Sequence, residues 1–219
     1  NTYSVLVTDV NGCSATNITT VINPPILSSG VIITSNVNCN GGNNGSASVN
    51  PTGGTLPYTY LWSNGQTTST TAGLTAGMYS VTTTDVNGCS SSTIFSITEP
   101  PILTTSVTST NVSCNGGNNG SASVTAGGGT IPYSYLWLDG QPTSTVIGLP
   151  HGTYSVTITD GKGCTKTDIA TITQPSILTE TMNITNVLCN GGNTGAALES
   201  VSGGVAPYSY KWSNDASSE

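Results

Sequence analysis

Residues 149–160 read Leu-Pro-His-Gly-Thr-Tyr-Ser-Val-Thr-Ile-Thr-Asp, and this stretch decides the fold that the sequence predicts. From Tyr154 onward the chain alternates strictly, with Tyr154, Val156 and Ile158 separated by hydroxyl-bearing residues. Successive side chains of a β-strand point to opposite faces, so the alternation places the three apolar residues on one face. The pattern therefore predicts a half-buried strand over residues 154–160.

The spacing that opens this strand, Leu-x-x-Gly-x-Tyr, recurs at residues 74–79 and ends there on Tyr79. A tyrosine at this place, the tyrosine corner, opens strand F of immunoglobulin-like sandwiches. We therefore expect an all-β fold of the immunoglobulin-like or fibronectin-III-like sandwich type. Around the better-marked copy, the alternation and the Gly- and Asp-containing turns predict further strands at residues 102–114, 120–125, 133–137 and 165–173.

The chain repeats itself about every 75 residues. Cys39, Cys114 and Cys189 are 75 positions apart, and so are Cys89 and Cys164. A fixed period indicates a tandem array, and about 75 residues suits a small self-contained sandwich. Prolines followed by an Ile-Leu pair mark the junctions. We expect the last two strands of a repeat in residues 1–24, complete repeats in 25–100 and 101–175, and the first three strands of a repeat in 176–219.

A comparison of the copies indicates which residues face the core. Tryptophan never varies at its position, whereas the residue before it is leucine in two copies and Lys211 in the third. Lysine is almost never buried without a partner, so the tryptophan faces inward and its neighbour outward. Glu199 stands where the other copies have valine, and we expect a local register change there. The predicted core residues are Trp62, Trp137, Trp212, Tyr60, Tyr135, Tyr79 and Tyr154.

Composition excludes two classes of partner. The chain contains 38 Thr, 29 Ser and 21 Asn but only 3 Lys and no Arg, and its formal charge is −7. Phosphate groups and anionic lipid heads are bound through cationic side chains, so we expect neither nucleic acid nor membrane as a partner. No apolar run approaches the roughly 20 residues of a membrane span, and no signal peptide is visible. Any export signal or anchor is expected outside residues 1–219.

Several residues that could form a site have simpler interpretations. The run Asn-Gly-Gly-Asn-Asn-Gly at residues 40–45 could form an anion nest, but no lysine accompanies it, and a tight loop that needs residues with positive φ explains it more simply. Asp9, Asp85 and Asp160 could bind calcium, yet calcium needs six to eight oxygen ligands, and an Asx turn is favoured. His151, the only histidine, is expected in a loop. The repeats share no catalytic triad or facing carboxylate pair, so we expect no enzyme, cofactor or metal site.

Three runs together resemble a known repeat. They are Cys-Asn-Gly-Gly-Asn-Asn-Gly-Ser-Ala-Ser-Val at 114–124, Gly-Gly-Thr-Ile-Pro-Tyr-Ser-Tyr-Leu-Trp at 128–137 and Gly-Thr-Tyr-Ser-Val-Thr-Ile-Thr-Asp at 152–160. They resemble the SprB repeat of long cell-surface adhesins in gliding Bacteroidetes. The resemblance implies export by the type IX secretion system to the cell surface, outside the outer membrane. It also implies adhesion during gliding, with the secretion and gliding machinery contacted by other regions. It names no catalytic or ligand residue.

The six cysteines suggest disulfides, since the count is even and the chain looks exported. An extended strand of about 12 residues spans about 40 Å, which separates Cys114 from Cys164 at opposite poles of one sandwich. The leading prediction is therefore an interdomain bond between Cys39 and Cys164. The alternatives are the intradomain pairs Cys39 with Cys89 and Cys114 with Cys164, or free thiols.

Three functions remain open at this point. The first is an adhesin that attaches the cell to an extracellular surface or polysaccharide. The second is an inert stalk that displays a binding or catalytic domain located elsewhere. The third is a carbohydrate-binding accessory module of a secreted enzyme. It is less favoured because such modules usually expose aromatic side chains, whereas the aromatic side chains of this chain are predicted in the core. Outward Leu61, Leu136 and Leu138 could form an adhesive strip, although scattered exposed apolar residues are ordinary.

Overall fold

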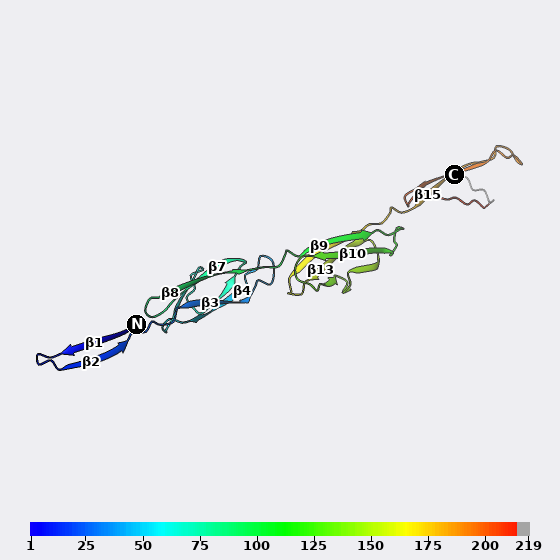
Figure 1. The fold of residues 1–219 in the computed structure, drawn as a ribbon. Helices are drawn as coiled ribbons and strands as arrows, with labels where there is room; N and C mark the ends of the chain where they lie inside the picture. Colours follow the sequence, from blue (N-terminus) through cyan, green and yellow to red (C-terminus); the bar gives the residue numbers. More distant parts are fainter. Residues whose placement is uncertain (214–219) are drawn as a thin grey trace. The chain divides into compact units, whose positions relative to one another are not determined.

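The computed structural model describes residues 1–213, which form 16 β-strands and no helix. The chain divides into two compact units, Asn1–Pro100 and Pro101–Glu219 (Figure 1). Each unit contains one complete sandwich of two three-stranded sheets and one two-stranded hairpin. The fold is a tandem array of all-β sandwich repeats, as the sequence predicts. The four-part division of the chain at residues 24, 100 and 175 stays a prediction.

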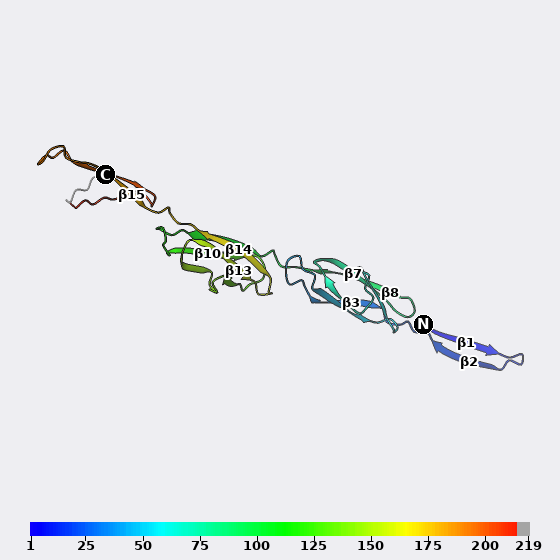
Figure 2. The ribbon, with the colours of Figure 1, turned by 180° about the vertical axis from the view of Figure 1, so that it is seen from behind.

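In the second unit, the complete sandwich consists of two antiparallel sheets. The strand order is β12-β10-β9 in one sheet and β11-β13-β14 in the other. In immunoglobulin terms these are strands E-B-A and C-F-G. The view from behind shows β14 beside β13 (Figure 2). The strands are β9 (Thr104–Thr110), β10 (Gly120–Gly127), β11 (Ser134–Trp137), β12 (Thr145–Leu149), β13 (Gly152–Thr159) and β14 (Thr165–Ile172).

The first unit repeats this topology. Its sheets have the orders β3-β4-β6 and β5-β7-β8, and again every pair is antiparallel. The register of β3 with β4 shifts between Ile33 and Ser35, near the end of β3. The strands are β3 (Ser28–Ser35), β4 (Gly45–Thr52), β5 (Thr59–Trp62), β6 (Thr70–Leu74), β7 (Gly77–Thr84) and β8 (Ser90–Ile97).

Two hairpins flank the complete sandwiches in the sequence. β1 (Thr2–Thr8) pairs with β2 (Ser14–Thr20), and β15 (Thr179–Thr185) pairs with β16 (Ala196–Ser202). They correspond in sequence to β13–β14 and β9–β10. Glu199 lies opposite Met182 in the same register as Val124 opposite Val107 one repeat earlier. The expected register change at Glu199 is therefore wrong, because the backbone ladder of β15 and β16 continues through this residue without a bulge.

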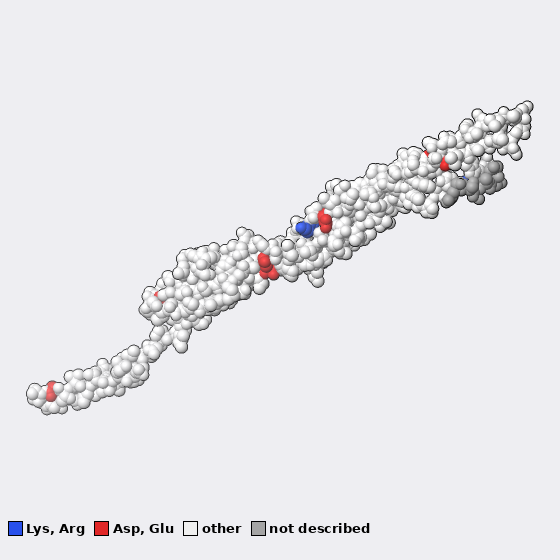
Figure 3. Space-filling view, turned by 90° about the horizontal axis from the view of Figure 1, so that it is seen from above, with Lys and Arg blue, Asp and Glu red and all other residues white. Residues whose placement is uncertain are grey.

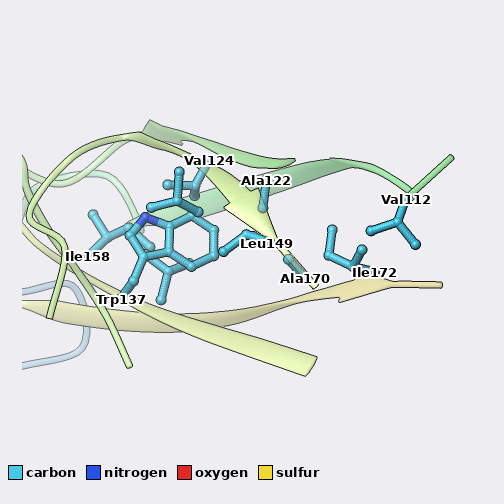
Figure 4. Close-up of a cluster of buried hydrophobic side chains, with 10 residues drawn as sticks. Val112, Ala122, Val124, Trp137, Leu149, Ile158, Ala170 and Ile172 are labelled. Atoms are coloured by element: carbon cyan, nitrogen blue, oxygen red, sulfur yellow. The ribbon is translucent and has the colours of Figure 1, made fainter. Parts of the chain in front are cut away.

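The core lies between the two sheets of each sandwich. Trp137 and Ile158 come from one sheet and Val124 from the other, and their side chains meet in the interior (Figure 4). In the first unit the rings of Phe95 and Trp62 pack in a T-shaped arrangement, with 5.7 Å between ring centroids. The core of residues 101–175 contains Val112, Ala122, Val124, Trp137, Val146, Leu149, Val156, Ile158, Ala170 and Ile172.

The predicted strand boundaries are close to the observed ones except at two places. The strand expected over 102–114 ends at Thr110. Past this point the chain leaves β10, and Val112 donates its backbone N–H to the carbonyl of Thr173, just after the end of β14. The sequence reasoning did not identify β12, which has only five residues. A strand this short gives too few alternations to stand out from a loop.

Candidate functional surfaces

The tryptophans of the two complete repeats are not available to a ligand. Trp62 and Trp137 are only 2 % and 1 % exposed, and Trp212 is half-buried. The indole N–H of Trp62 donates to the Thr68 carbonyl at 2.7 Å, and that of Trp137 donates to the Thr143 carbonyl at 2.9 Å. Each of these two buried rings therefore packs in a core and has a hydrogen-bond acceptor for its N–H, as buried indoles require.

The tyrosines brace loops against the sandwich. Tyr154 donates its hydroxyl to the carbonyl of Pro150 at 3.0 Å, and Tyr79 donates to the carbonyl of Thr75 at 3.2 Å. These bonds span four residues upstream and form the tyrosine corner that the Leu-x-x-Gly-x-Tyr spacing predicts. The half-buried rings of Tyr60, Tyr79, Tyr135 and Tyr154 also pack against the cores.

A second tyrosine brace was not found from the sequence. Tyr133 donates its hydroxyl to the carbonyl of Gly128, and the backbone N–H of Gly129 donates to Pro101 at 2.8 Å. Gly128 has a φ of +68°, and a Cβ there would lie 1.9 Å from the carbonyl oxygen of Ile102. Only glycine allows the chain to approach the junction this closely. The Gly-Gly pair that precedes Pro-Tyr in every copy was the available signal.

Each F–G turn is organised by one aspartate. The Oδ1 of Asp160 accepts backbone N–H bonds from Lys162 and Cys164 at 2.8 and 2.9 Å, and its Oδ2 accepts one from Thr130 at 2.9 Å. Asp85 makes the equivalent three bonds. The Oδ1 contacts confirm the Asx-turn interpretation. The bond to Thr130, which ties this turn to the loop before β11, was not predicted.

The same hydrogen bonds lower the pKa of these two carboxyl groups. Burial acts to raise the pKa of Asp160, but the backbone N–H bonds from Cys164, Thr130 and Lys162 outweigh it and lower the pKa below its usual value. The pKa of Asp85 is lowered in the same way, with burial opposing the N–H bonds from Cys89, Thr55 and Asn87. Both groups are therefore stable as carboxylates.

The Asn-Gly-Gly loop is hydrogen-bonded to the segment that follows the last strand of the same sandwich. Gly41, with a φ of +72°, donates its N–H to Oε2 of Glu99 at 2.6 Å, and Asn40 donates its side-chain amide to Oε1 of Glu99 and to the Pro100 carbonyl. The positive φ agrees with the tight-loop interpretation. The backbone also binds a carboxylate, as a nest would, but that carboxylate belongs to the same unit.

In the next repeat the equivalent loop is hydrogen-bonded to a neutral side chain. Gly116 donates to Oε1 of Gln174 at 2.9 Å, and Asn115 donates to the Pro175 carbonyl at 3.0 Å. Charge is therefore not required for the contact. The signal in the sequence was the 75-residue spacing of Glu99 and Gln174, each of which precedes a proline.

The cysteines are in two states. Cys39 and Cys164 are each disulfide-bonded. Cys13, Cys89, Cys114 and Cys189 are exposed free thiols. Cys89 and Cys114 would both be oxidised in the predicted intradomain pairs, so those pairs are not formed in this structure.

The remaining candidates lie on exposed surface. His151 is exposed in the loop before β13, as expected. Leu61 and Leu136 are 58 % and 56 % exposed on the outer sides of β5 and β11, and Leu138 is 79 % exposed. Among residues 1–213, no group of three or more metal-ligating side chains could hold an ion. The described chain also contains no helix long and apolar enough to cross a membrane.

The outer side of the β12-β10-β9 sheet is covered with hydroxyl groups. Its inner residues, such as Ala122 and Val124, are buried in the core, so the alternate residues point to solvent. Ser123 lies opposite Thr108 on one neighbouring strand and Thr145 on the other, which forms a row across the sheet. We call this surface the hydroxyl face. Its hydroxyl residues are Thr104, Ser106, Thr108, Thr110, Ser121, Ser123, Thr125 and Thr145. Ile147, which lies opposite Ser121 and is 75 % exposed, is an apolar residue on the same face.

The first unit has an equivalent hydroxyl face on β3, β4 and β6. Ser48 lies between Thr70 and Ile32, in the row that corresponds to Ser123. The other hydroxyl groups there belong to Ser28, Ser35, Ser46 and Thr52. None of the six strands that form the two faces contains a charged residue. Charged side chains are sparse in the space-filling view of the molecule (Figure 3).

Comparison with known proteins identifies the repeat. The SprB repeat family matches residues 31–67, 106–142 and 181–217, which together make up about half of the chain. No curated protein matches the chain. SprB repeats are structural repeats of adhesin-type cell-surface proteins and not a catalytic family. The three matches recur with the period of the strands, cysteines and tryptophans described above, and the chain belongs to the SprB repeat family.

Proposed function

We propose that residues 1–219 are a non-catalytic segment of a long cell-surface adhesin that attaches the cell to a substratum and serves in gliding motility. The observation that carries the proposal is the hydroxyl face, which occupies equivalent strands in both complete repeats. A surface repeated along an array can add many weak contacts by avidity without a deep pocket. Export by type IX secretion and coupling to the gliding machinery belong to the proposal and would be performed by regions outside this segment.

The chemistry of the hydroxyl face favours a neutral polysaccharide as the ligand. Hydroxyl groups both donate and accept hydrogen bonds, which matches a sugar surface made of the same groups. A shallow hollow of about 140 Å³ lies on this face beside Thr108, Thr110, Ser121 and Ser123. The six strands carry no cation to attract an anionic polymer, and the chain as a whole has a charge of −7 that repels one.

Bead retention under flow tests this proposal. Beads coated with chain 1–219 would be passed over surfaces of neutral polysaccharide, anionic polysaccharide and glass, with an unrelated tandem sandwich protein as the control. We expect retention above the control on the neutral polysaccharide. A double variant, Thr108→Val with Thr125→Val, removes two hydroxyls from the face and should reduce retention. Thr157→Val with Thr167→Val, a matched change on the outer side of the other sheet, should not. Retention equal to the control protein would contradict the adhesive role.

An inert stalk is the second candidate, and the loop contacts to Glu99 and Gln174 favour it. These contacts hold the outgoing segment against its own sandwich, which suits a spacer of defined length. The same flow experiment separates the two functions, since a stalk would not be retained. The third candidate, a carbohydrate-binding accessory module, is weakened by the burial of Trp62 and Trp137, because such modules stack sugars on exposed aromatic rings.

We also propose that Cys39 and Cys164 form a bond with each other, which would join successive repeats. The strand-length argument from the sequence supports this pairing, and so does the oxidised state of both residues beside four free thiols. In the chain-entropy model a bond that closes a loop of order 100 residues contributes up to about 5 kcal/mol. Non-reducing peptide mapping of the intact chain should recover Cys39 joined to Cys164. Recovery of Cys39 joined to Cys89 would contradict the proposal.

A further inference from the structure

The first and last strands of each complete repeat lie side by side but are not joined by a backbone ladder. β9 belongs to one sheet and β14 to the other. Individual hydrogen bonds connect them instead: Thr105 donates to Asp168 at 2.9 Å, and Ser109 donates to the Thr171 carbonyl at 3.1 Å. We call this line of contacts, together with its continuation beyond the two strands, the seam.

Beyond the strands the seam continues to the end of the repeat. Asn111 accepts the backbone N–H of Thr173 at 2.8 Å, and Val112 donates its own N–H to the Thr173 carbonyl at 3.2 Å. The Asn115 and Gly116 contacts to Pro175 and Gln174 follow. Residue numbers rise together on both sides of the seam, so the two segments run parallel.

The first unit has the same seam. Asn36 accepts the N–H of Thr98 at 3.0 Å, and Val37 donates to the Thr98 carbonyl at 3.0 Å. Near the start of β3, Ser29 donates its hydroxyl to the Ser91 carbonyl at 2.9 Å. The loop contacts of Asn40 and Gly41 complete it. The asparagine, valine and Asn-Gly positions recur in the third copy as Asn186, Val187, Asn190 and Gly191.

We propose that this seam is the element of each repeat that bears tension along the chain. The chain enters the repeat at the start of β9 and leaves after the end of β14. Tension therefore pulls two parallel segments in opposite directions along their length. Bonds that lie across such a pair are loaded in shear and must yield together, whereas the bonds of a hairpin pulled open at one end yield one at a time.

The neighbouring strands hold more firmly than the seam does. β9 is paired with β10 over seven residues, and β14 is paired with β13 over eight. The seam has separate bonds in place of such a ladder, so its rupture would set the force at which the repeat opens. This inference holds whether the repeats bind the substratum themselves or act as a stalk.

Single-molecule force spectroscopy of chain 1–219 held by its two ends tests the proposal. Reductant is present so that no disulfide carries the load, and no ligand is needed. Each complete repeat should release about 210–230 Å of chain when it opens, from about 75 residues at 3.3–3.6 Å each less the roughly 40 Å that the folded repeat already spans. The two openings in one molecule serve as internal references for each other.

The seam variant combines Asn111→Ala with Asn115→Ala and removes two side chains that bridge the seam. We expect one of the two openings to become about 30-fold faster at a fixed force, at about 1 kcal/mol per bond and 1.36 kcal/mol per factor of ten. The other opening should keep its rate. The matched control, Ser134→Ala with Thr157→Val, removes two side-chain hydrogen bonds within the β11-β13-β14 sheet, away from the seam. It should change neither opening.

Two results would overturn the proposal. One is an unchanged opening rate in the seam variant, and the other is an equal acceleration in the control variant. If the double seam variant fails to fold and one opening is missing, Gln174→Ala provides the test. It removes only the acceptor of the Gly116 N–H. We expect it to accelerate one opening about fivefold, and no acceleration would likewise overturn the proposal.

Discussion

Replacing Thr83 with valine should stabilise the first complete repeat. Thr83 lies on β7 with its side chain facing the core, where it is 0 % exposed. Among residues 1–213, its hydroxyl is the buried side-chain oxygen or nitrogen atom that has no hydrogen-bond partner. The equivalent residue in the next repeat is Ile158, also 0 % exposed, so an aliphatic side chain fits this position of the fold.

The magnitude follows from the cost of burying an unpaired hydroxyl. Mutational data put this cost at about 1–3 kcal/mol, and valine keeps nearly the same shape without it. We therefore expect Thr83→Val to raise the free energy of unfolding of this repeat by about 1–2 kcal/mol. The reverse change in the other repeat, Ile158→Thr, loses apolar burial and adds an unpaired hydroxyl. It should cost about 2–4 kcal/mol.

Hydrogen exchange measured by mass spectrometry in the intact chain gives the amide exchange rates of each repeat separately. For Thr83→Val, the slowest amides of β4 and β7 should exchange about 5- to 30-fold more slowly, while those of β10 and β13 keep their rates. Thr82→Val is the matched control, because Thr82 faces solvent and its hydroxyl is bonded to Ser92 at 2.8 Å. It should give no gain. Equal or faster exchange in Thr83→Val would refute the reasoning about the unpaired hydroxyl.

The remaining predictions concern residues 101–175. In a denaturant titration, Gly128→Ala should destabilise this repeat by at least about 2 kcal/mol, because its Cβ would collide with the Ile102 carbonyl at positive φ. Gly163→Ala, with a φ of +83° and open space around it, should cost only about 1 kcal/mol in the same titration. The lowered pKa of Asp160 means that its contribution to stability is complete above the unfolded value, about 3.9, and is lost as the pH falls through the folded value. Asp160→Asn should lower stability at neutral pH and flatten the acid limb of the unfolding curve, and an unaltered acid limb would contradict the assignment. Tyr154→Phe should cost about 1 kcal/mol by thermal unfolding, and no change would mean that the tyrosine-corner bond is not stabilising.

The contrast between the two faces of each sheet explains why the adhesive surface has to be sought outside the aromatic residues. Trp137 is held by the core and by its bond to Thr143, so its removal would destabilise the fold and say little about binding. Thr108 and Thr125 are exposed, so their replacement changes surface chemistry while the core remains intact. For this reason the retention experiment uses the hydroxyl face.

The sequence by itself determined the repeat, the sandwich class and the direction in which its side chains face. The alternation from Tyr154 to Ile158 predicts a strand with one buried side, since the period of a strand is local and appears in the order of residues. The tyrosine corner could be predicted for the same reason, because its donor and acceptor are four residues apart. Asp160 was interpreted correctly as the cap of its own turn, which involves neighbours at two and four positions.

Only the tertiary structure decided the contacts between residues far apart in the chain. The hydrogen bond from Thr130 to Asp160 spans 30 positions in the sequence, and the hydrogen bond from Gly116 to Gln174 spans 58. A hydrogen bond of this kind leaves no periodic trace in the sequence, because it depends on where two sheets place their ends. The unpaired hydroxyl of Thr83 is invisible in the sequence for the same reason, since threonine fits a half-buried strand and only the packed core shows that no acceptor is within reach.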